Sequence, residues 1–518
     1  MITAEFQNRL FQNFLIPSDM KFSVKRYNFD VIGGEYQATV EVTGNKNSIF
    51  ALIGWLRYSV KLRDNRTNKR WNGYISKVTI NWDEIAISAS IDTMTNNAAV
   101  AYTDSNIRYT TAWSADTTST AEYGTKEALL SKDEVSAALA LQYRDTELQS
   151  KKYPIPGIPT FGKSSTTQKA TIECYGWAYT LKWRFYANNS GKESYETLGE
   201  GGREIGEDER PNCAMSFQIS STGAWDMNAI WLHCYKYPSS APPTDNLVCS
   251  LYSNSGVDPN VSLTSGALAG AAIGTSSDWL KFVMGASVTL NPATTYWIVV
   301  SRSGVTDATK YFMVDTNRDN GYTKGSLKLY DTTVSAWHDY DFKGDMNFIV
   351  EGGLEITQQI TNMIASIGEF VVGTVIEKVS GVETLPYRDG DNTAWYELLK
   401  LLEVGTTDDK RLLCKIDENR YLRVYEEPAQ PTSMENAYKL DGKGNLYDPF
   451  NRLVDPSECV TGVWCALKDV IPESVDISKL GNISPFFIEE AEYNADNNTY
   501  SILRSKNQTD VFDIGGID

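Results

Sequence analysis

The stretch LGEGGREIGEDERP, residues 198–211, divides the chain into two kinds of sequence. It is rich in glycine and acidic residues, a composition typical of a linker rather than of a packed element. From Met215 to about Val350 the sequence shows strand-like patterns alone, separated by many Gly, Ser and Thr residues, and it closes on EGGLE at residues 351–355. About 140 residues of such strands predict a β-sandwich or jelly roll over residues 205–352. The expected strands lie at residues 229–235, 247–253, 280–284, 295–301 and 346–351.

The sequences on either side of this block are mixed. Short alternating runs with turn residues between them, including Asn72-Gly73, predict a small β-barrel or sandwich near the N-terminus. SKDE at residues 131–134 has the form of a capping box and predicts a helix from Val135 to Leu148. Apolar spacing predicts a second helix from Ile356 to Ile367, and Thr393 is the expected N-cap of a third, which stops at Gly405. A hairpin is expected at residues 411–416 and 420–425.

We therefore predict a mainly β (α+β) fold, in which small β-barrel domains with a few helices are interrupted by a β-sandwich. The predicted domains are an N-terminal β-barrel, a second domain with an Ala-rich helix, the inserted sandwich, a helix-hairpin domain and a C-terminal β segment. Their expected boundaries are residues 1–105, 106–200, 205–352, 355–430 and 431–518.

Charge and rare residues exclude several classes of protein. The chain has 518 residues, with 48 basic and 66 acidic side chains, so the formal net charge is −18. This acidity argues against a nucleic-acid-binding module, which would present a basic face. Two histidines, His233 and His338, are too few for a three-imidazole metal site. Seven widely spaced cysteines without a C-x-x-C motif indicate neither a zinc ribbon nor a disulfide scaffold.

Membrane and secretion signals are not recognisable. The first residues lack a basic region followed by an apolar stretch, and the longest apolar runs are too short to span a bilayer. We expect a protein that folds in a reducing cytoplasm.

Motifs for chemistry are weak throughout the chain. DTNRDNG, residues 315–321, begins like a calcium loop, but Asn320 stands where the loop requires Gly and Ser326 where it requires Glu. We interpret it as an Asx-rich turn, with a looser calcium site as the alternative. His233 on its strand is interpreted as a structural histidine. We expect no catalytic residue, metal or cofactor, and hence no enzyme.

Aromatic residues crowd the predicted sandwich and are the one positive signal. Flat rings in loops can stack on sugar rings while neighbouring Asp and Asn side chains bind hydroxyl groups. Tyr296 and Trp297 lie within a strand-like run and are expected in the core. Trp337 and Tyr322 stand among Gly, Asp and Ser and are expected to be exposed. The candidate ligand-binding residues are Trp337, Tyr322, Trp279 and Asp315.

The order of several segments resembles the baseplate or tail-tip hub proteins of tailed bacteriophages. These segments are GWLRYSV (54–60), WNGYI (71–75), YGTKE (123–127), CYGWAYTL (174–181) and DENRYLRVY (417–425). The inserted block is similar to jelly-roll adhesion modules of surface and phage proteins, which resemble carbohydrate-binding domains. It carries LNPATTYWIVV (290–300), GYTKG (321–325), Trp337 and DMNF (345–348).

This resemblance implies a structural subunit of the virion that closes the tail tube and connects it to host-recognition parts. It implies a homo-oligomer, with a trimer favoured, in contact with distal tail or tube proteins and with tape-measure, fibre or spike proteins. Host surface polysaccharide is the expected ligand of the inserted block, and DNA would be only passing cargo. The alternatives are a hexameric distal tail ring protein and a free-standing receptor-binding adhesin or glycan-degrading enzyme.

Overall fold

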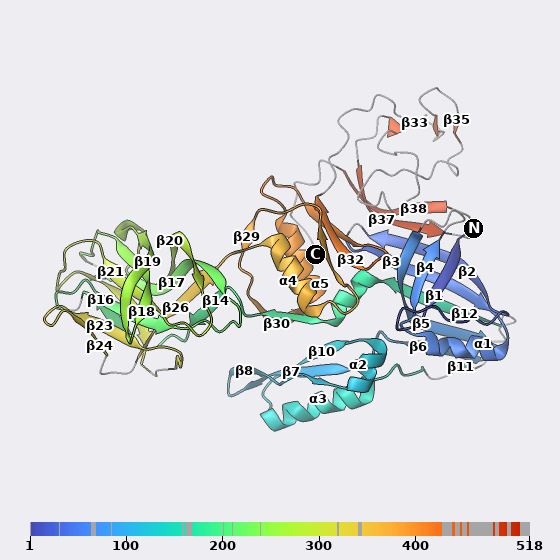
Figure 1. Ribbon diagram of the computed structural model, residues 1–518, viewed down its shortest axis with the longest axis horizontal. Helices are drawn as coiled ribbons and strands as arrows, with labels where there is room; N and C mark the ends of the chain where they lie inside the picture. Colours follow the sequence, from blue (N-terminus) through green and yellow to red (C-terminus); the bar gives the residue numbers. More distant parts are fainter. Residues whose placement is uncertain are drawn as a thin grey trace. The chain divides into compact units, whose positions relative to one another are not determined.

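The computed structural model describes residues 2–426, except 31, 64–68, 84, 158–159, 162–167, 200, 210, 239, 319–320 and 340–343. Beyond Glu426 it describes only the backbone of short strands between 438 and 507. The chain forms two compact units (Figure 1). Unit 1 contains Met1–Tyr186, Ile360–Val382 and Asp391–Asp518, and unit 2 contains Ala187–Gln359 and Glu383–Gly390. A mainly β fold with a few helices is therefore confirmed.

Unit 1 is built on a ten-stranded, largely antiparallel sheet in which β5 and β12 are central. The strands that pair in it run β1-β4-β5-β12-β3-β2-β37-β38, with β6 and β11 added beside β5. Their bounds are β1 Thr3–Gln7, β2 Lys21–Asp30, β3 Gly34–Thr43, β4 Ser59–Arg63, β5 Lys69–Trp82, β6 Ile85–Ser90, β11 Thr160–Phe161, β12 Lys169–Gly176, β37 Phe486–Asn494 and β38 Thr499–Asn507.

Smaller groups of elements complete unit 1. A four-stranded sheet carries the helices α2 and α3, and a three-stranded sheet lies in the segment that also forms α4 and α5. The bounds are α1 Lys46–Ala51, η1 Leu52–Trp55, β7 Asn97–Asp104, β8 Ile107–Thr110, β9 Ser114–Ala115, α2 Thr117–Tyr123, β10 Glu127–Lys132, α3 Ala137–Lys151, η2 Trp177–Trp183, β13 Phe185–Asn188, α4 Ile356–Ile367, β28 Gly373–Ile376, β30 Arg388–Thr393, α5 Ala394–Val404, β31 Leu412–Ile416, β32 Tyr421–Glu426, β33 Tyr438–Leu440, β34 Leu446–Tyr447, β35 Leu453–Val454 and β36 Leu480–Gly481.

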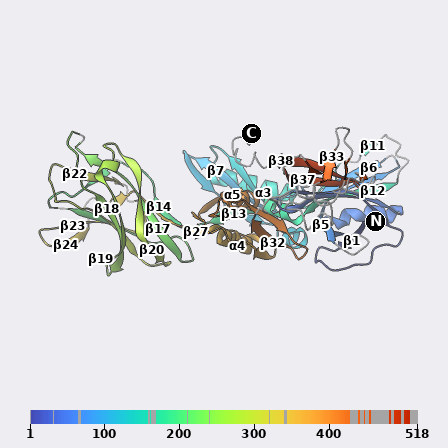
Figure 2. The same ribbon diagram turned by 90° about the horizontal axis from the view of Figure 1, so that it is seen from above.

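Unit 2 is a sandwich of two sheets, as Figure 2 shows for β17, β18, β19 and β22. The first sheet contains β14 Lys192–Tyr195, β15 Gly201–Ile205, β17 Trp225–Tyr237, β20 Asp278–Leu290, β22 Tyr311–Asn317, β25 Asp345–Met346 and β26 Phe348–Gly352. The second contains β16 Asn212–Phe217, β18 Leu247–Ser255, β19 Asp258–Leu268, β21 Tyr296–Arg302, β23 Leu327–Asp331 and β24 Ala336–Asp339. The short η3 Gly270–Ala272 and the pair β27 Leu354–Glu355 and β29 Glu383–Thr384 complete the unit.

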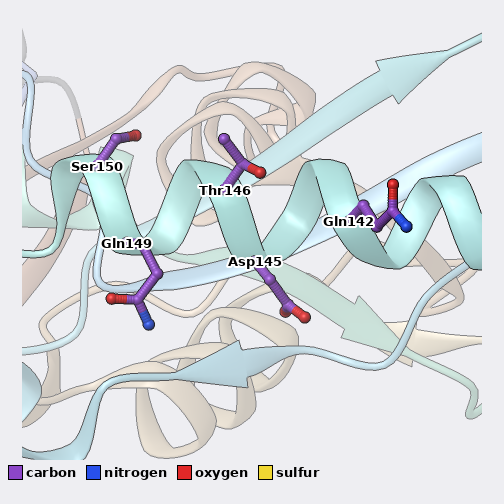
Figure 3. Close-up of a pocket in the computed structure, with 5 residues that line it drawn as sticks. All are labelled: Gln142, Asp145, Thr146, Gln149 and Ser150. Atoms are coloured by element: carbon purple, nitrogen blue, oxygen red, sulfur yellow. The ribbon is translucent and has the colours of Figure 1, made fainter.

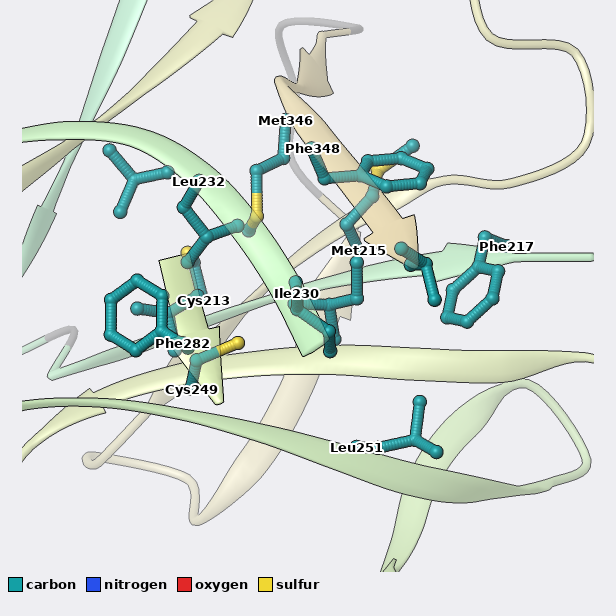
Figure 4. Packing of buried hydrophobic residues seen from close by; sticks show 14 of the residues in the cluster. Cys213, Met215, Phe217, Ile230, Leu232, Cys249, Leu251, Phe282, Met346 and Phe348 are labelled. Atoms are coloured by element: carbon teal, nitrogen blue, oxygen red, sulfur yellow. The ribbon is translucent and has the colours of Figure 1, made fainter. Parts of the chain in front are cut away.

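A dry apolar core holds the two sheets of unit 2 together. Ile230 and Leu232 of β17 are fully buried and face Met215 of β16 and Leu251 of β18 across it (Figure 4). Cys213, Cys234 and Cys249 lie in the same core, where burial raises the pKa of each thiol well above its usual range. They pack as small apolar side chains, and all described cysteines are free.

Three local expectations are confirmed. The five apolar residues that predicted α4, from Ile356 to Ile367, are all buried. Thr393 caps α5, because its hydroxyl accepts a hydrogen bond from the amide of Tyr396, and Gly405 ends the helix with a φ of 77°. In the hairpin of β31 and β32, Asp417 accepts bonds from the amides of Asn419 and Tyr421 and thereby fixes the turn.

Three other expectations are wrong. The presumed linker at 198–211 contributes strand β15, whose glycines let it approach β22: a Cβ on Gly201 would lie 2.6 Å from the Thr316 hydroxyl. Ser131 belongs to strand β10, which pairs in parallel with β7, and Ser136 caps α3 instead. Asn72-Gly73 is no turn and lies within the long strand β5. The C-terminal segment 431–518 lies largely outside the described residues.

Gly73 is required because two backbones of unit 1 approach each other there. It pairs with Gly176 across β5 and β12, and a Cβ at Gly73 would lie 2.1 Å from the carbonyl oxygen of Tyr175. Such an atom forces the two central strands of the sheet apart.

We predict that Gly73→Ala lowers the free energy of unfolding of unit 1 by about 1–3 kcal/mol. The matched control is Gly54→Ala in η1, where a Cβ meets nothing within 4 Å. Thermal unfolding followed by circular dichroism measures both variants. Equal transitions for the two would show that the sheet has room at Gly73.

Candidate functional site

The outer surface of the first sheet of unit 2 carries a row of aromatic side chains. Because side chains alternate along a strand, burial of Ile230, Leu232 and Cys234 in the core points the intervening residues of β17 outward. We call the outward residues the aromatic face; its members are Trp231, His233, Tyr235 and Tyr237 on β17, Trp279 on β20 and Tyr311 on β22. All six are partly exposed, and Tyr237 is 47% exposed.

Strand register brings four of these rings into contact as two pairs. His233 is opposite Trp279, and their ring centroids lie 5.2 Å apart in an edge-to-face arrangement. Tyr237 is opposite Tyr311, and these rings stack with centroids 5.1 Å apart. The face thus carries two cross-strand ring pairs over three neighbouring strands, with Trp231 and Tyr235 on the same side of β17.

Charged side chains fix the orientation of the rings. Asp315 of β22 lies 2.6 Å from Nδ1 of His233. The indole of Trp231 donates a hydrogen bond to Glu351 at 2.7 Å, and Lys281 lies over the same ring, 5.1 Å from its centroid. Lys281 also pairs with Glu351 at 3.2 Å. The rings of Trp231 and His233 are therefore oriented by charged neighbours before any ligand arrives.

Two tyrosines of the face, Tyr235 and Tyr311, remain protonated. Burial raises the pKa of Tyr235, and the charges of Asp315 and Glu204 raise it further. The pKa of Tyr311 is raised by burial and by Glu204 in the same way. Their hydroxyl groups are thus neutral hydrogen-bond donors and acceptors over the physiological pH range.

Two of the four predicted ligand residues meet on this face. Trp279 and Asp315 come from strands that do not pair with each other, and His233 contacts both. His233 is hydrogen-bonded, to Asp315, as its interpretation as a structural histidine requires. Its ring lies on the outer surface of the sheet, beside Trp279. In the described part of the chain, Nε2 of His233 forms no hydrogen bond with a hydroxyl or thiol.

The other two predicted residues lie elsewhere. Tyr322 is only 6% exposed, so its expected exposure is wrong. It packs on Phe348, and its hydroxyl donates to the buried carboxylate of Glu193 at 3.0 Å. Trp337 is partly exposed on the second sheet, where it packs edge-on against Tyr330 and covers the cluster around Trp297.

Five residues of the aromatic face were not predicted from sequence: Tyr311 of β22 and the four residues of β17, Trp231, His233, Tyr235 and Tyr237. The pattern W-x-H-x-Y-x-Y was the available signal, because four ring-bearing residues at a spacing of two must share one face of a strand. Tyr340, another of the crowded aromatics, lies outside the described residues.

A shallow hollow in unit 1 is a poor alternative site. Its volume is about 660 Å³, and its lining comes from one helix, α3. Figure 3 shows Thr146 and Ser150 projecting from one side of this helix and Asp145 and Gln149 from another. These small polar groups do not converge on a common point.

Comparisons with known proteins do not assign a family. No family model and no curated protein matches the sequence. Among solved structures, the chain has a TM-score of 0.16 and 8% identity to the VP2 subviral particle of infectious bursal disease virus, covering 65% of this chain and 82% of that one. It has the same TM-score and identity to a Bacillus thuringiensis Cry1Da tryptic core variant, covering 60% of this chain and 51% of that one. Similarity at this level carries no argument about fold or function. No helix among the described residues is long and apolar enough to cross a membrane.

We predict that Tyr322→Phe destabilises unit 2 by about 1–3 kcal/mol, because the buried carboxylate of Glu193 loses a hydrogen bond. Tyr252→Phe is the control: this residue is partly buried in the same unit, and its hydroxyl forms no hydrogen bond in the described structure. Chemical denaturation monitored by tryptophan fluorescence compares them. Identical denaturation midpoints for the two variants would mean that the hydrogen bond between Tyr322 and Glu193 does not contribute to the stability of unit 2.

Proposed function

We propose that unit 2 binds a saccharide on its aromatic face and that the whole chain is a structural subunit of a phage tail tip. The two cross-strand ring pairs on the outer surface of the first sheet carry the saccharide part of this proposal. Sugar rings present flat C–H faces that stack on aromatic rings, while their hydroxyl groups need nearby hydrogen-bonding partners. Trp279, Tyr237 and Tyr311 supply the rings, and Asp315 and Glu351 supply acceptors.

The charges on this surface select the class of sugar. Glu204, Asp315 and Glu351 are acidic, and Lys281 is already paired with Glu351. A polyanionic glycan would be repelled by this excess of carboxylates. A neutral or amino-bearing saccharide is therefore the ligand that the face suits best.

The partial burial of the rings favours binding over catalysis. The rings are oriented by their neighbours, so little conformational entropy is lost when a ligand stacks on them. The His233–Asp315 pair orients a ring beside Trp279 rather than activating a nucleophile. A binding module of a structural protein accounts for this arrangement without an active site.

The position of unit 2 in the chain supports the tail-tip part. Three segments of unit 1 flank and interrupt the sandwich, as expected for a module carried by a larger structural subunit. Within unit 1, the segments whose order resembles phage hub proteins lie in the ten-stranded sheet, in the smaller sheets and in the short helices beside them. A trimer at the end of the tail tube, with tube proteins on one side and fibre or spike proteins on the other, is the proposed assembly.

We predict that Tyr237→Ala and Trp279→Ala each weaken saccharide binding about tenfold or more, or about 1.4 kcal/mol. An array of bacterial surface oligosaccharides probed with the full chain identifies the ligand, and calorimetry then measures the variants. Tyr396→Ala is the control, since Tyr396 is 48% exposed on α5 and thus resembles Tyr237 in exposure. Trp337→Ala, on the other sheet, is expected to bind normally.

Two outcomes contradict the saccharide proposal. One is the absence of binding to every oligosaccharide on the array. The other is loss of binding in Trp337→Ala with normal binding in Tyr237→Ala and Trp279→Ala, which would assign the ligand to the second sheet.

We predict that antibody against this chain labels the tail tip of intact virions in electron microscopy and that native mass spectrometry gives three copies. Six copies would instead favour a distal tail ring. Label on the capsid, or none on the particle, would contradict a tail location.

A further inference from the structure

Two short motifs of the same form face each other in unit 2. They are Asp315-Thr-Asn317 at the end of β22 and Asp345-Met-Asn347, which begins at β25. Asn317 is the cross-strand partner of Asp345, and the amide of Asn347 donates to the carbonyl of Asp315 at 3.1 Å. Residues opposite each other on antiparallel strands project from the same face, so the four oxygen-bearing side chains gather there. Met346, which separates Asp345 from Asn347 in the sequence, lies in the apolar core.

Two of these side chains are buried with oxygens that have no partner. Asp345 and Asn347 are both 0% exposed. One carboxylate oxygen of Asp345 accepts a hydrogen bond from the amide of Tyr322 at 2.8 Å, but its Oδ1 accepts none. The Nδ2 group of Asn347 donates to the carbonyl of Thr197 at 2.8 Å, while its Oδ1 has no donor. A buried acceptor left unpaired costs about 1–3 kcal/mol, and a buried charge costs more.

No positive side chain compensates Asp345 within the described residues. It forms no ion pair with a lysine, arginine or histidine there. Burial raises the pKa of this carboxyl, and the amide of Tyr322 offsets only part of that effect. Something with positive charge, or a proton, must therefore balance the carboxylate.

The segment before β15 closes over the cluster. The carbonyl of Thr197 accepts hydrogen bonds from the amide groups of both Asn317 and Asn347. Gly199 lies directly against Asn317, because a Cβ there would be 2.7 Å from its Cγ and Oδ1 atoms. The unpaired oxygens are thus shielded from solvent by this segment.

We propose that Asp345 and Asn347 bind a calcium ion through their unpaired oxygens, beside Asp315 and Asn317. Calcium takes carboxylate, amide and carbonyl oxygens in flexible geometry, whereas magnesium requires a near-ideal octahedron and zinc prefers nitrogen or sulfur. The ion neutralises Asp345 and satisfies Asn347, and it ties β22, β25 and the segment over them together. This site does not depend on the proposed saccharide function. It differs from the calcium loop considered from sequence, since its central ligands come from residues 345 and 347.

The test is calorimetric titration of the full chain with calcium chloride after treatment with EDTA. We expect one ion per chain, with a dissociation constant on the order of 10⁻⁴ M because few ligands are charged. Asp345→Asn keeps the shape of the side chain and removes its charge, and it should bind at least about 30-fold more weakly, since a neutral ligand replaces the buried carboxylate of the site. The control is Asp339→Asn, because the Asp339 side chain in the same unit is 82% exposed.

Thermal unfolding of the wild type gives a second measurement that needs no variant. Millimolar calcium should raise the transition by several degrees relative to EDTA, since an ion that binds only the folded state stabilises it. A wild type that neither binds calcium nor shifts its transition would overturn the proposal, and so would equal affinity in Asp345→Asn. An Asp345→Asn protein more stable than a calcium-insensitive wild type would show instead that the carboxyl is protonated.

Discussion

Strand β17 is the element on which unit 2 depends. It pairs with β20 along one edge and with β26 and then β22 along the other, so most of the first sheet is assembled around it. Its side chains alternate between the core and the outer surface, and this alternation cannot be changed for one residue without reversing the others. Burial of Ile230, Leu232 and Cys234 therefore commits Trp231, His233 and Tyr235 to the outside. The stability of the sandwich and the presence of the aromatic face follow from the same register.

The outer surfaces of the two sheets are used differently. On the second sheet, Trp297 is only 2% exposed because Trp337, Tyr252 and Lys328 cover it, and its indole donates to Asn254. On the first sheet the rings are oriented by Asp315 and Glu351 but remain partly exposed. The aromatic residues of the second sheet thus cover its outer surface, whereas those of the first sheet leave their rings accessible to a ligand. This difference, rather than aromatic content, favours the first sheet as the binding surface.

The elements that were predicted correctly are those whose formation depends on residues close together in the sequence. The apolar spacing from Ile356 to Ile367, the cap at Thr393 and the Asp417 turn act within a few residues, so they could be recognised without the fold. Features that depend on distant partners could not. Ser131, expected in a capping box, lies in a strand because β10 pairs with β7. Part of the expected linker at 198–211 forms β15 because its glycines fit against β22.

The candidate site was only half predictable for the same reason. Trp279 and Asp315 could be chosen by residue type, but only the register of β17 with β20 and β22 places His233 between them. Tyr322 was misjudged because its polar sequence neighbours suggest a loop, whereas its partner Glu193 is 129 residues away. Likewise, the paired Asp-x-Asn motifs become a cluster only when β25 meets β22.

Hydroxyl-radical footprinting of the full chain, with and without a bound oligosaccharide, tests the central claim most directly. Oxidation of Trp231, Trp279 and Tyr237 should fall when the ligand binds, while oxidation of Trp337 should not change. Protection of Trp337 with unchanged oxidation of the β17 residues would contradict the assignment of the aromatic face as the binding surface.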